Sequence, residues 1–372
     1  MSAEKPNQQE TDPMHGLSGN IYADLAKSVE QQRSIRERTA EAWKQYVGYG
    51  PDYQRRNAER AKSARAQVEQ FGDGQLTIIA SINTKKYNQA GKEVKGAEAK
   101  RPGLKEGEAT DLHDYNPESR SHADIEAAYA DYLAQTKPEE RLIIFEGRVR
   151  PDELTSDRDT AIREASESGL LQYIARRDGV ESISGEPSDE AVAQYCYERG
   201  VTPDELALVL TIRGLTHDLT SDLPDDISMN LYGEAAVNRL DGFVNYSPEE
   251  KIEKSKDPAA MAQLQHQAVE LAKRQNEILR SLNLSQFEID EQANTVRFAS
   301  PEDRAALAKA WDPSSEGRLS DIHTIMTEAR DKHILDTIVD ATESGKKVFM
   351  AYGGSHVVSL EPSLESYYKK SN

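Results

Sequence analysis

The sequence predicts an α/β fold, in which a central mixed or mostly parallel sheet is flanked by helices. Three short apolar runs predict the buried strands of that sheet: Leu76–Ile82, Leu142–Phe145 and Val348–Ala351. A continuous apolar run, unlike an alternating one, is typical of a strand that is buried on both faces. Helical spacing of apolar residues follows between these runs, and strands that alternate with helices indicate α/β organisation.

Composition divides the chain of 372 residues into successive segments. The polar, aperiodic start predicts disorder, and a helical N-terminal extension follows it. A helical insertion is expected to interrupt the α/β core. The boundaries are 1–19 for the disordered segment, 20–72 for the extension, 73–219 for the first part of the core, 220–320 for the insertion, and 321–372 for the last helix and strand.

Apolar periodicity also locates the connecting helices. Ser188, followed by acidic residues, is expected to cap the start of one of them. Residues 85–108 have no apolar period and predict a long loop. The other expected helices are Tyr53–Gln70, Ala123–Gln135, Thr160–Arg177, Pro203–Leu215, Pro258–Leu282 and Asp321–Ala341, with a short strand at Val180–Ile183.

Charge and cysteine content restrict the function classes. The net charge is -19, and a polyanion repels phosphate backbones, so a nucleic-acid partner is disfavoured. The lone cysteine, Cys196, can form neither a disulfide within the chain nor a cysteine-based zinc site. No apolar leader and no stretch of membrane-spanning length stands out. We therefore expect a cytoplasmic protein that does not interact with membranes.

Chemically useful side chains follow the predicted strands at their carboxyl ends, where ligands bind in open α/β sheets. Glu146 ends the Leu142 strand, and His356 comes just after the glycine pair that closes the last strand. His113 lies in a polar loop before the Leu142 strand, and Arg330 lies with Asp331 and His333 on the helix before the last strand. We expect His113, Glu146, His356 and Arg330 to meet at one edge of the sheet.

Two kinds of chemistry fit such a group. Two imidazoles and a carboxylate can hold a divalent cation and leave one position open for a water, whose pKa the ion lowers. The metal ligands would be His113, Glu146 and His356. Without a metal, His113 or His356 would act as general base, oriented by Glu146. Arg330 or Arg148 would hold an anionic substrate group or stabilise an oxyanion.

Each of these residues also has a purely structural interpretation. Glu146 would pair with Arg148 or cap a helix, and His113 would be an exposed loop residue. His356 would end a simple turn and cap the next helix, and Arg330 would belong to a surface ion pair. The spacing of the residues leaves both interpretations open.

Three sequence pieces carry a resemblance to a known family: Phe-Glu-Gly at 145–147, the segment SESGL…GEPSDE at 166–190, and Gly-Gly-Ser-His at 353–356. Together they resemble the TraB/ChaN/TIKI superfamily, which has the erythromycin-esterase/ChaN-like fold, over about residues 110–365. The resemblance implies an α/β fold with a site at the sheet edge. Members include metal-dependent peptidases with two G-x-x-H histidines and a strand-end glutamate, esterases that use histidine and glutamate without a required metal, and haem-uptake lipoproteins.

The resemblance assigns roles by position. The second G-x-x-H histidine corresponds to His356, the strand-end glutamate to Glu146, and the arginine of the preceding helix to Arg330. The first histidine corresponds to His113, but Thr110 stands where the motif has glycine. The implied cofactor is a divalent cation such as Mn, Co or Zn.

We therefore expect a metal-dependent hydrolase that activates water to attack an ester or amide of a small-molecule or peptide substrate. The alternative is a non-catalytic ligand- or partner-binding protein on the same fold. In that case the acidic surface and the N-terminal helices would contact a protein partner or a second copy of the chain.

Overall fold

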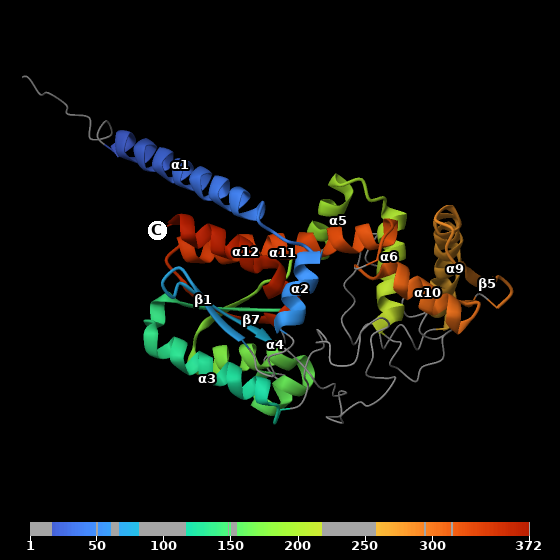
Figure 1. Cartoon of the computed structure of the whole chain (residues 1–372), viewed down its shortest axis with the longest axis horizontal. Coiled ribbons are helices and arrows are strands. Elements are labelled where there is room, and N and C mark those ends of the chain that lie inside the picture. Colours follow the sequence, from blue (N-terminus) through green and yellow to red (C-terminus); the bar gives the residue numbers. More distant parts are fainter. Residues whose placement is uncertain are drawn as a thin grey trace, which may run out of the picture.

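The protein has the predicted α/β fold, in a computed structural model that describes residues 17–49, 51–60, 67–81, 117–147, 149, 155–217, 258–293, 295–313 and 315–371. Its main sheet has five strands in the order β1-β2-β7-β3-β4, with helices on both faces (Figure 1). All neighbours pair in parallel except β1 and β2. The strands are β1 Gln67–Phe71, β2 Leu76–Ser81, β3 Arg141–Phe145, β4 Glu181–Ser184 and β7 Lys347–Gly353.

Strand β7 is the centre of the sheet. Its Met350 pairs with Ile78 on β2 and with Ile144 on β3, and all three side chains are buried. This burial on both faces explains why the central strands have continuous apolar sequences. Because β3 and β7 are parallel neighbours, their carboxyl ends lie side by side, with Glu146 just after one and Gly353 at the end of the other.

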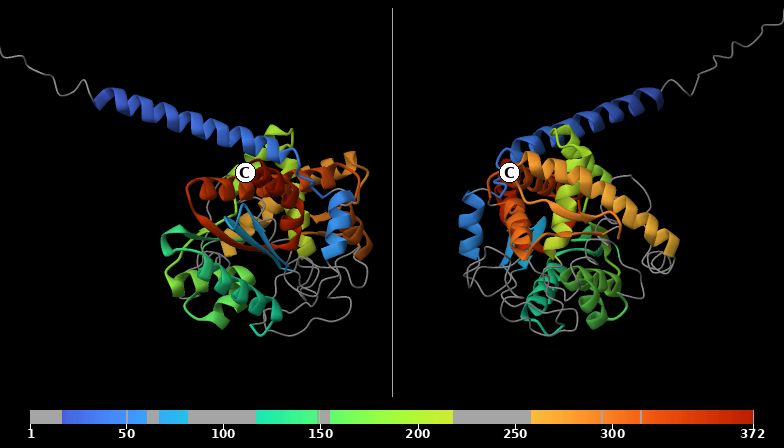
Figure 2. Two further views of the ribbon diagram at one scale, coloured as in Figure 1. Left: turned by 60° about the vertical axis from the view of Figure 1, so that its left-hand side comes forward. Right: turned by 90° about the vertical axis from the view of Figure 1, so that its right-hand side faces the viewer.

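The core has one apolar layer on each face of the sheet. On one face, α11 (Arg318–Glu343) and α12 (Gly354–Ser371) pack with the end of α1 (Leu17–Trp43) against side chains such as Met350. On the other face, α3 (Arg120–Gln135) and α4 (Arg158–Asp178) pack against Phe349 and its neighbours. Figure 2 shows α1 crossing the α11–α12 side and projecting beyond the rest of the molecule.

The predicted helices of the core are confirmed, with ends that differ by a few residues. Ser188 caps α5 as expected, because its side chain accepts a hydrogen bond from the backbone N–H of Ala191. Further described helices are α5 Asp189–Glu198, α6 Pro203–His217, α9 Pro258–Ser281, α10 Pro301–Trp311 and the short 3₁₀ helix η2 Pro138–Glu140.

The N-terminal extension differs from the prediction in two places. Helix α1 begins at Leu17, so residues 17–19 are helical, and residues 1–16 lie outside the described part of the chain. Helix α2 is Pro51–Arg60, and Gln67–Phe71 is strand β1 in place of a helix end. The reason is the tight turn at 72–75, where Gly72, Asp73 and Gly74 all have positive φ and fold β1 back onto β2.

The expected helical insertion also needs a correction. Within its described residues, a two-stranded hairpin of β5 (Phe287–Asp290) and β6 (Thr295–Phe298) follows α9. Phe287 and Phe298 are paired across this hairpin, with ring centroids 5.5 Å apart. A separate apolar cluster joins the hairpin to α5, α6, α9, α10 and the first half of α11. The loop predicted at 85–108 and the residues from 218 to 257 lie outside the described part of the chain.

None of the helices in these described ranges combines the length and the apolar character that crossing a bilayer requires.

Candidate active site

The carboxyl ends of the parallel strands are joined through Glu146. Its Oε2 accepts a hydrogen bond of 3.1 Å from the backbone N–H of Gly353, the last residue of β7. At the neighbouring strand, Ser184 Oγ donates to the carbonyl of Gly147 at 2.6 Å and accepts from the backbone N–H of Glu186 at 3.1 Å. Glu146 and Glu186 are therefore held at the same edge of the sheet.

His356 lies beside Glu146, although not in a loop. Helix α12 begins at Gly354, so His356 belongs to its first turn and does not end a turn that precedes the helix. The imidazole Nε2 lies 4.0 Å from Glu146 Oε1, and the side chain is only 6% exposed. The Tyr352 ring meets the imidazole edge-on, with centroids 5.8 Å apart. The structure thus brings Glu146 and His356 together.

The other imidazole nitrogen is held by Asp331, a fully buried residue of α11. His356 Nδ1 is 2.5 Å from Asp331 Oδ1. The second oxygen, Oδ2, accepts hydrogen bonds of 2.7 Å from Ser359 Oγ on α12 and from the hydroxyl of Tyr46. Because a carboxylate only accepts, the ring nitrogen that faces it carries the proton, and Nε2 is left with its lone pair on the Glu146 side.

Arg330 connects the two strand-end glutamates. Its guanidinium binds both oxygens of Glu186, at 2.8 and 2.7 Å, and also contacts Glu146 Oε1 at 3.3 Å. Burial acts to lower the pKa of Arg330, but the charges of Glu186 and Glu146 more than offset it, so the pKa is raised and the group is cationic. A two-pronged pair of this kind fixes the orientation of the guanidinium as well as its charge.

The protonation of His356 is governed by opposing effects. Burial lowers the pKa of the imidazole, and the charge of Arg330 acts in the same direction. The charge and hydrogen bond of Asp331, with a contribution from Glu146, act the other way, and the net effect is a pKa above the usual value. His356 is thus a base whose proton uptake is strengthened by its carboxylate neighbour.

The predicted metal site can be tested only in part. His113 lies outside the described residues, as do Arg148 and Thr110. Across the described ranges, no group of three or more His, Cys, Asp or Glu side chains is arranged to hold a metal ion. Both oxygens of Glu146 already accept hydrogen bonds, and the Arg330 guanidinium puts positive charge beside the space between Glu146 and His356. The described residues fit proton chemistry at His356 better than a resident cation, and the metal stays a prediction.

Sequence reasoning missed three participants. Asp331 was noted only as a neighbour of Arg330, and the hydrogen bonds of the cluster described above do not involve His333, which was noted with it. A usable signal existed, because Asp331 falls on the apolar stripe of α11, in register with the buried Ile334, Leu335 and Ile338. Tyr46 and Ser359 had no such signal, because nothing in their local sequence marks them.

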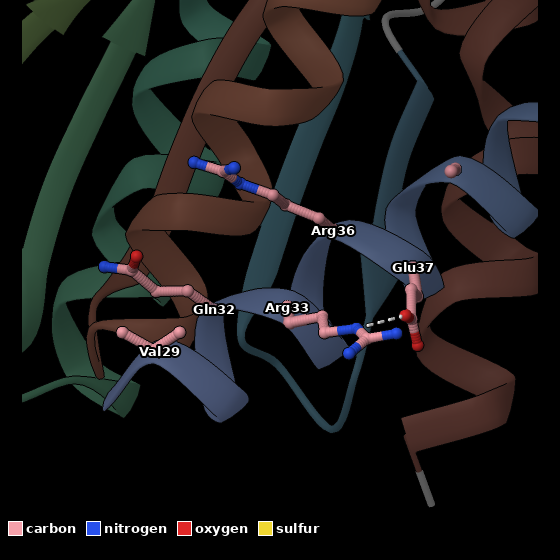
Figure 3. Close-up of a pocket in the computed structure, with 6 residues that line it drawn as sticks. Val29, Gln32, Arg33, Arg36 and Glu37 are labelled. Atoms are coloured by element: carbon pink, nitrogen blue, oxygen red, sulfur yellow. Dashed lines mark hydrogen bonds and ion pairs between the residues drawn. The ribbon is translucent and has the colours of Figure 1, made fainter. Parts of the chain in front are cut away.

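A surface hollow elsewhere on the molecule offers no comparable chemistry. It lies along α1, and Figure 3 shows Val29, Gln32, Arg33, Arg36 and Glu37 around it. Arg33 and Glu37 pair with each other at 2.9 Å, and both side chains are mostly exposed. Because all of its lining residues come from one exposed helix face, the hollow is a groove between side chains and not a converging site.

Comparison with protein-family models, with curated proteins and with solved structures finds no match for this chain. The resemblance to the TraB/ChaN/TIKI superfamily therefore rests on the sequence motifs alone.

Proposed function

We propose that this protein is a hydrolase in which His356 takes a proton from water as that water attacks an ester or amide carbonyl. The observation that supports this most is the Asp331–His356 pair, which directs a basic Nε2 toward Glu146 and Arg330 at the sheet edge. An imidazole held by a buried carboxylate is a recurring general base in hydrolysis. The resemblance to esterases that use histidine and glutamate favours the same reaction.

The proposed step balances with the groups present. Water gives one proton to His356 Nε2, and its oxygen bonds to the carbonyl carbon to form a tetrahedral oxyanion. The C–O or C–N bond then breaks, and the imidazolium returns the proton to the leaving alcohol or amine. Arg330 supplies the nearby positive charge that stabilises the oxyanion, while Glu146 and Glu186 hold its guanidinium in place.

A metal-dependent version of this proposal uses the same residues. It requires a cation bound by His113, Glu146 and His356, which would supply Lewis acidity and a more acidic water. We place the reaction in the cytoplasm, because the lone Cys196 can form no disulfide within the chain.

The first experiment is a hydrolysis screen of the full chain. The substrates are p-nitrophenyl esters of increasing acyl length and a chromogenic anilide, each with EDTA or with added Mn, Co or Zn. We expect turnover of at least one ester, insensitivity to EDTA, and loss of about 10³-fold or more in His356→Gln. Turnover that EDTA abolishes, with metal in the purified protein, would favour the metal-dependent version. Equal turnover by wild type and His356→Gln would contradict the role of His356.

Ligand binding without catalysis is the competing function. The observation that weighs against catalysis is the low exposure of the His356 side chain, 6%, because an attacking water must reach its Nε2. A binding protein would show no turnover with any substrate of the screen, yet would gain thermal stability from one of its ligands. A hydrolase would release the chromophore catalytically, with many turnovers per protein molecule.

A further inference from the structure

The chain that follows α1 reaches into the candidate active site. Tyr46 comes three residues after Trp43, the last residue of α1, and its hydroxyl donates to Asp331 Oδ2 at 2.7 Å. The Tyr46 ring is stacked on Trp43, with centroids 4.2 Å apart and planes 15° apart. The Lys332 ammonium lies over the ring of Trp43. The aromatic contact limits the positions that the hydroxyl can take.

The Tyr46 hydroxyl donates to the Asp331 carboxylate, whose position is also restricted by burial and by other hydrogen bonds. Asp331 is fully buried, and a buried carboxylate is costly unless its oxygens accept hydrogen bonds. His356 occupies Oδ1, while Ser359 and Tyr46 share Oδ2. Ser359 comes from α12, the helix that also carries His356, so among the described residues only Tyr46 ties the carboxylate to a part of the chain outside α11 and α12.

The orientation of His356 depends on this arrangement. The carboxylate plane sets the direction in which Oδ1 accepts from Nδ1, and the ring direction in turn sets where Nε2 is aimed. The 4.0 Å approach of Nε2 to Glu146 therefore depends on how firmly Oδ2 is anchored. Burial and the neighbouring Asp331 raise the pKa of Tyr46 far above its usual value, so its hydroxyl stays protonated and remains a donor.

We propose that Tyr46 is a positioning residue of the active site, through which the N-terminal extension completes the Asp331–His356 pair. This inference deepens the proposed function, and it rests on that function for its catalytic meaning. The extension is then part of the site and not an appendage of the fold. The structural part of the inference is that the Tyr46 hydroxyl stiffens the Asp331–His356 hydrogen bond. This part can be tested without any substrate.

The test measures the His356 Nδ1–H proton in full-length protein labelled with ¹⁵N-histidine. We compare wild type with Tyr46→Phe, which keeps the ring and its stacking on Trp43 and removes only the hydroxyl. The matched control is Tyr368→Phe, which removes a buried hydroxyl that bonds Thr342 Oγ1 at 3.3 Å, away from His356. Circular dichroism and the melting temperature establish that each variant is folded.

We expect wild type to show an Nδ1–H tautomer with slow proton exchange. Tyr46→Phe should exchange this proton about tenfold faster, the factor that corresponds to losing one hydrogen bond of about 1.4 kcal/mol. Tyr368→Phe should match wild type. An unchanged rate in Tyr46→Phe, an Nε2–H tautomer in wild type, or an equal acceleration in Tyr368→Phe would overturn the inference.

The same variants separate this inference from the proposed function. If Tyr46→Phe alters Nδ1–H exchange while wild type hydrolyses nothing in the screen, the positioning role stands and the hydrolase proposal fails. If wild type hydrolyses an ester and Tyr46→Phe matches it both in exchange and in kcat, the inference fails and the hydrolase proposal stands.

Discussion

Replacing Arg330 with methionine should lower the free energy of unfolding by about 3 kcal/mol, because it leaves two partly buried carboxylates without their counter-charge. The side chains of Arg330, Glu146 and Glu186 are 22%, 16% and 17% exposed, so water can compensate only in part. Methionine keeps much of the apolar stem, and the effect can be assigned to the lost guanidinium. Urea unfolding followed by circular dichroism measures the difference.

A matched control separates the loss of the guanidinium from a general cost of the substitution. Arg274→Met is the matched control, since Arg274 also lies on a helix and pairs with a carboxylate, Asp204, but both groups are about half exposed. It should cost at most about 0.5 kcal/mol. A similar small loss in Arg330→Met would mean that the cluster is solvated and not preorganised.

The second large effect is expected in Asp331→Asn. An asparagine has one acceptor oxygen and an amide that donates, whereas Asp331 accepts from His356, Ser359 and Tyr46. The amide favours the His356 tautomer with the proton on Nε2, which removes the lone pair that would accept a proton from water. We expect kcat/KM for the ester found in the screen to fall on the order of 10⁴-fold.

Asp336→Asn is the control for this substitution. Asp336 lies further along the same helix and pairs with Lys332, and its side chain is 45% exposed. It should leave kcat/KM unchanged and stability within about 0.5 kcal/mol. If Asp331→Asn retains most of the wild-type activity while remaining folded, then the Asp331–His356 pair is structural and the base is a different residue.

The central sheet could be predicted from sequence because each of its buried strands has an apolar run in its own short segment. Leu142–Phe145 and Val348–Ala351 are continuous apolar runs, and a strand buried on both faces requires such runs. Strand β1 was missed because it is an edge strand with polar residues between Val68 and Phe71, and its pairing depends on a turn with positive φ. Short, polar edge strands do not differ enough from helix ends in their pattern.

The candidate site likewise contains some residues that the sequence could predict and others that it could not. Glu146 and His356 follow strand ends, and parallel strands place their ends together, so the meeting of these two residues follows from the topology. Asp331 was not predicted as a site residue. Its place among the buried apolar residues of α11 was a signal, because a charge in such a position must have hydrogen-bonding partners. Tyr46 could not be anticipated, because its contact joins the N-terminal extension to a helix near the other end of the chain.

The most direct test of His356 as the general base compares two titrations of the wild-type protein. One is the pH dependence of kcat/KM for the ester found in the screen, and the other is the NMR titration of His356 in the free protein. Both should show one midpoint above the usual histidine value of about 6.5, because Asp331 raises the pKa of the imidazole, and activity should rise as the proton leaves. The rising limb should be absent from the residual activity of His356→Gln. A rising limb that persists in His356→Gln, or a midpoint that differs from the NMR titration, would contradict the account.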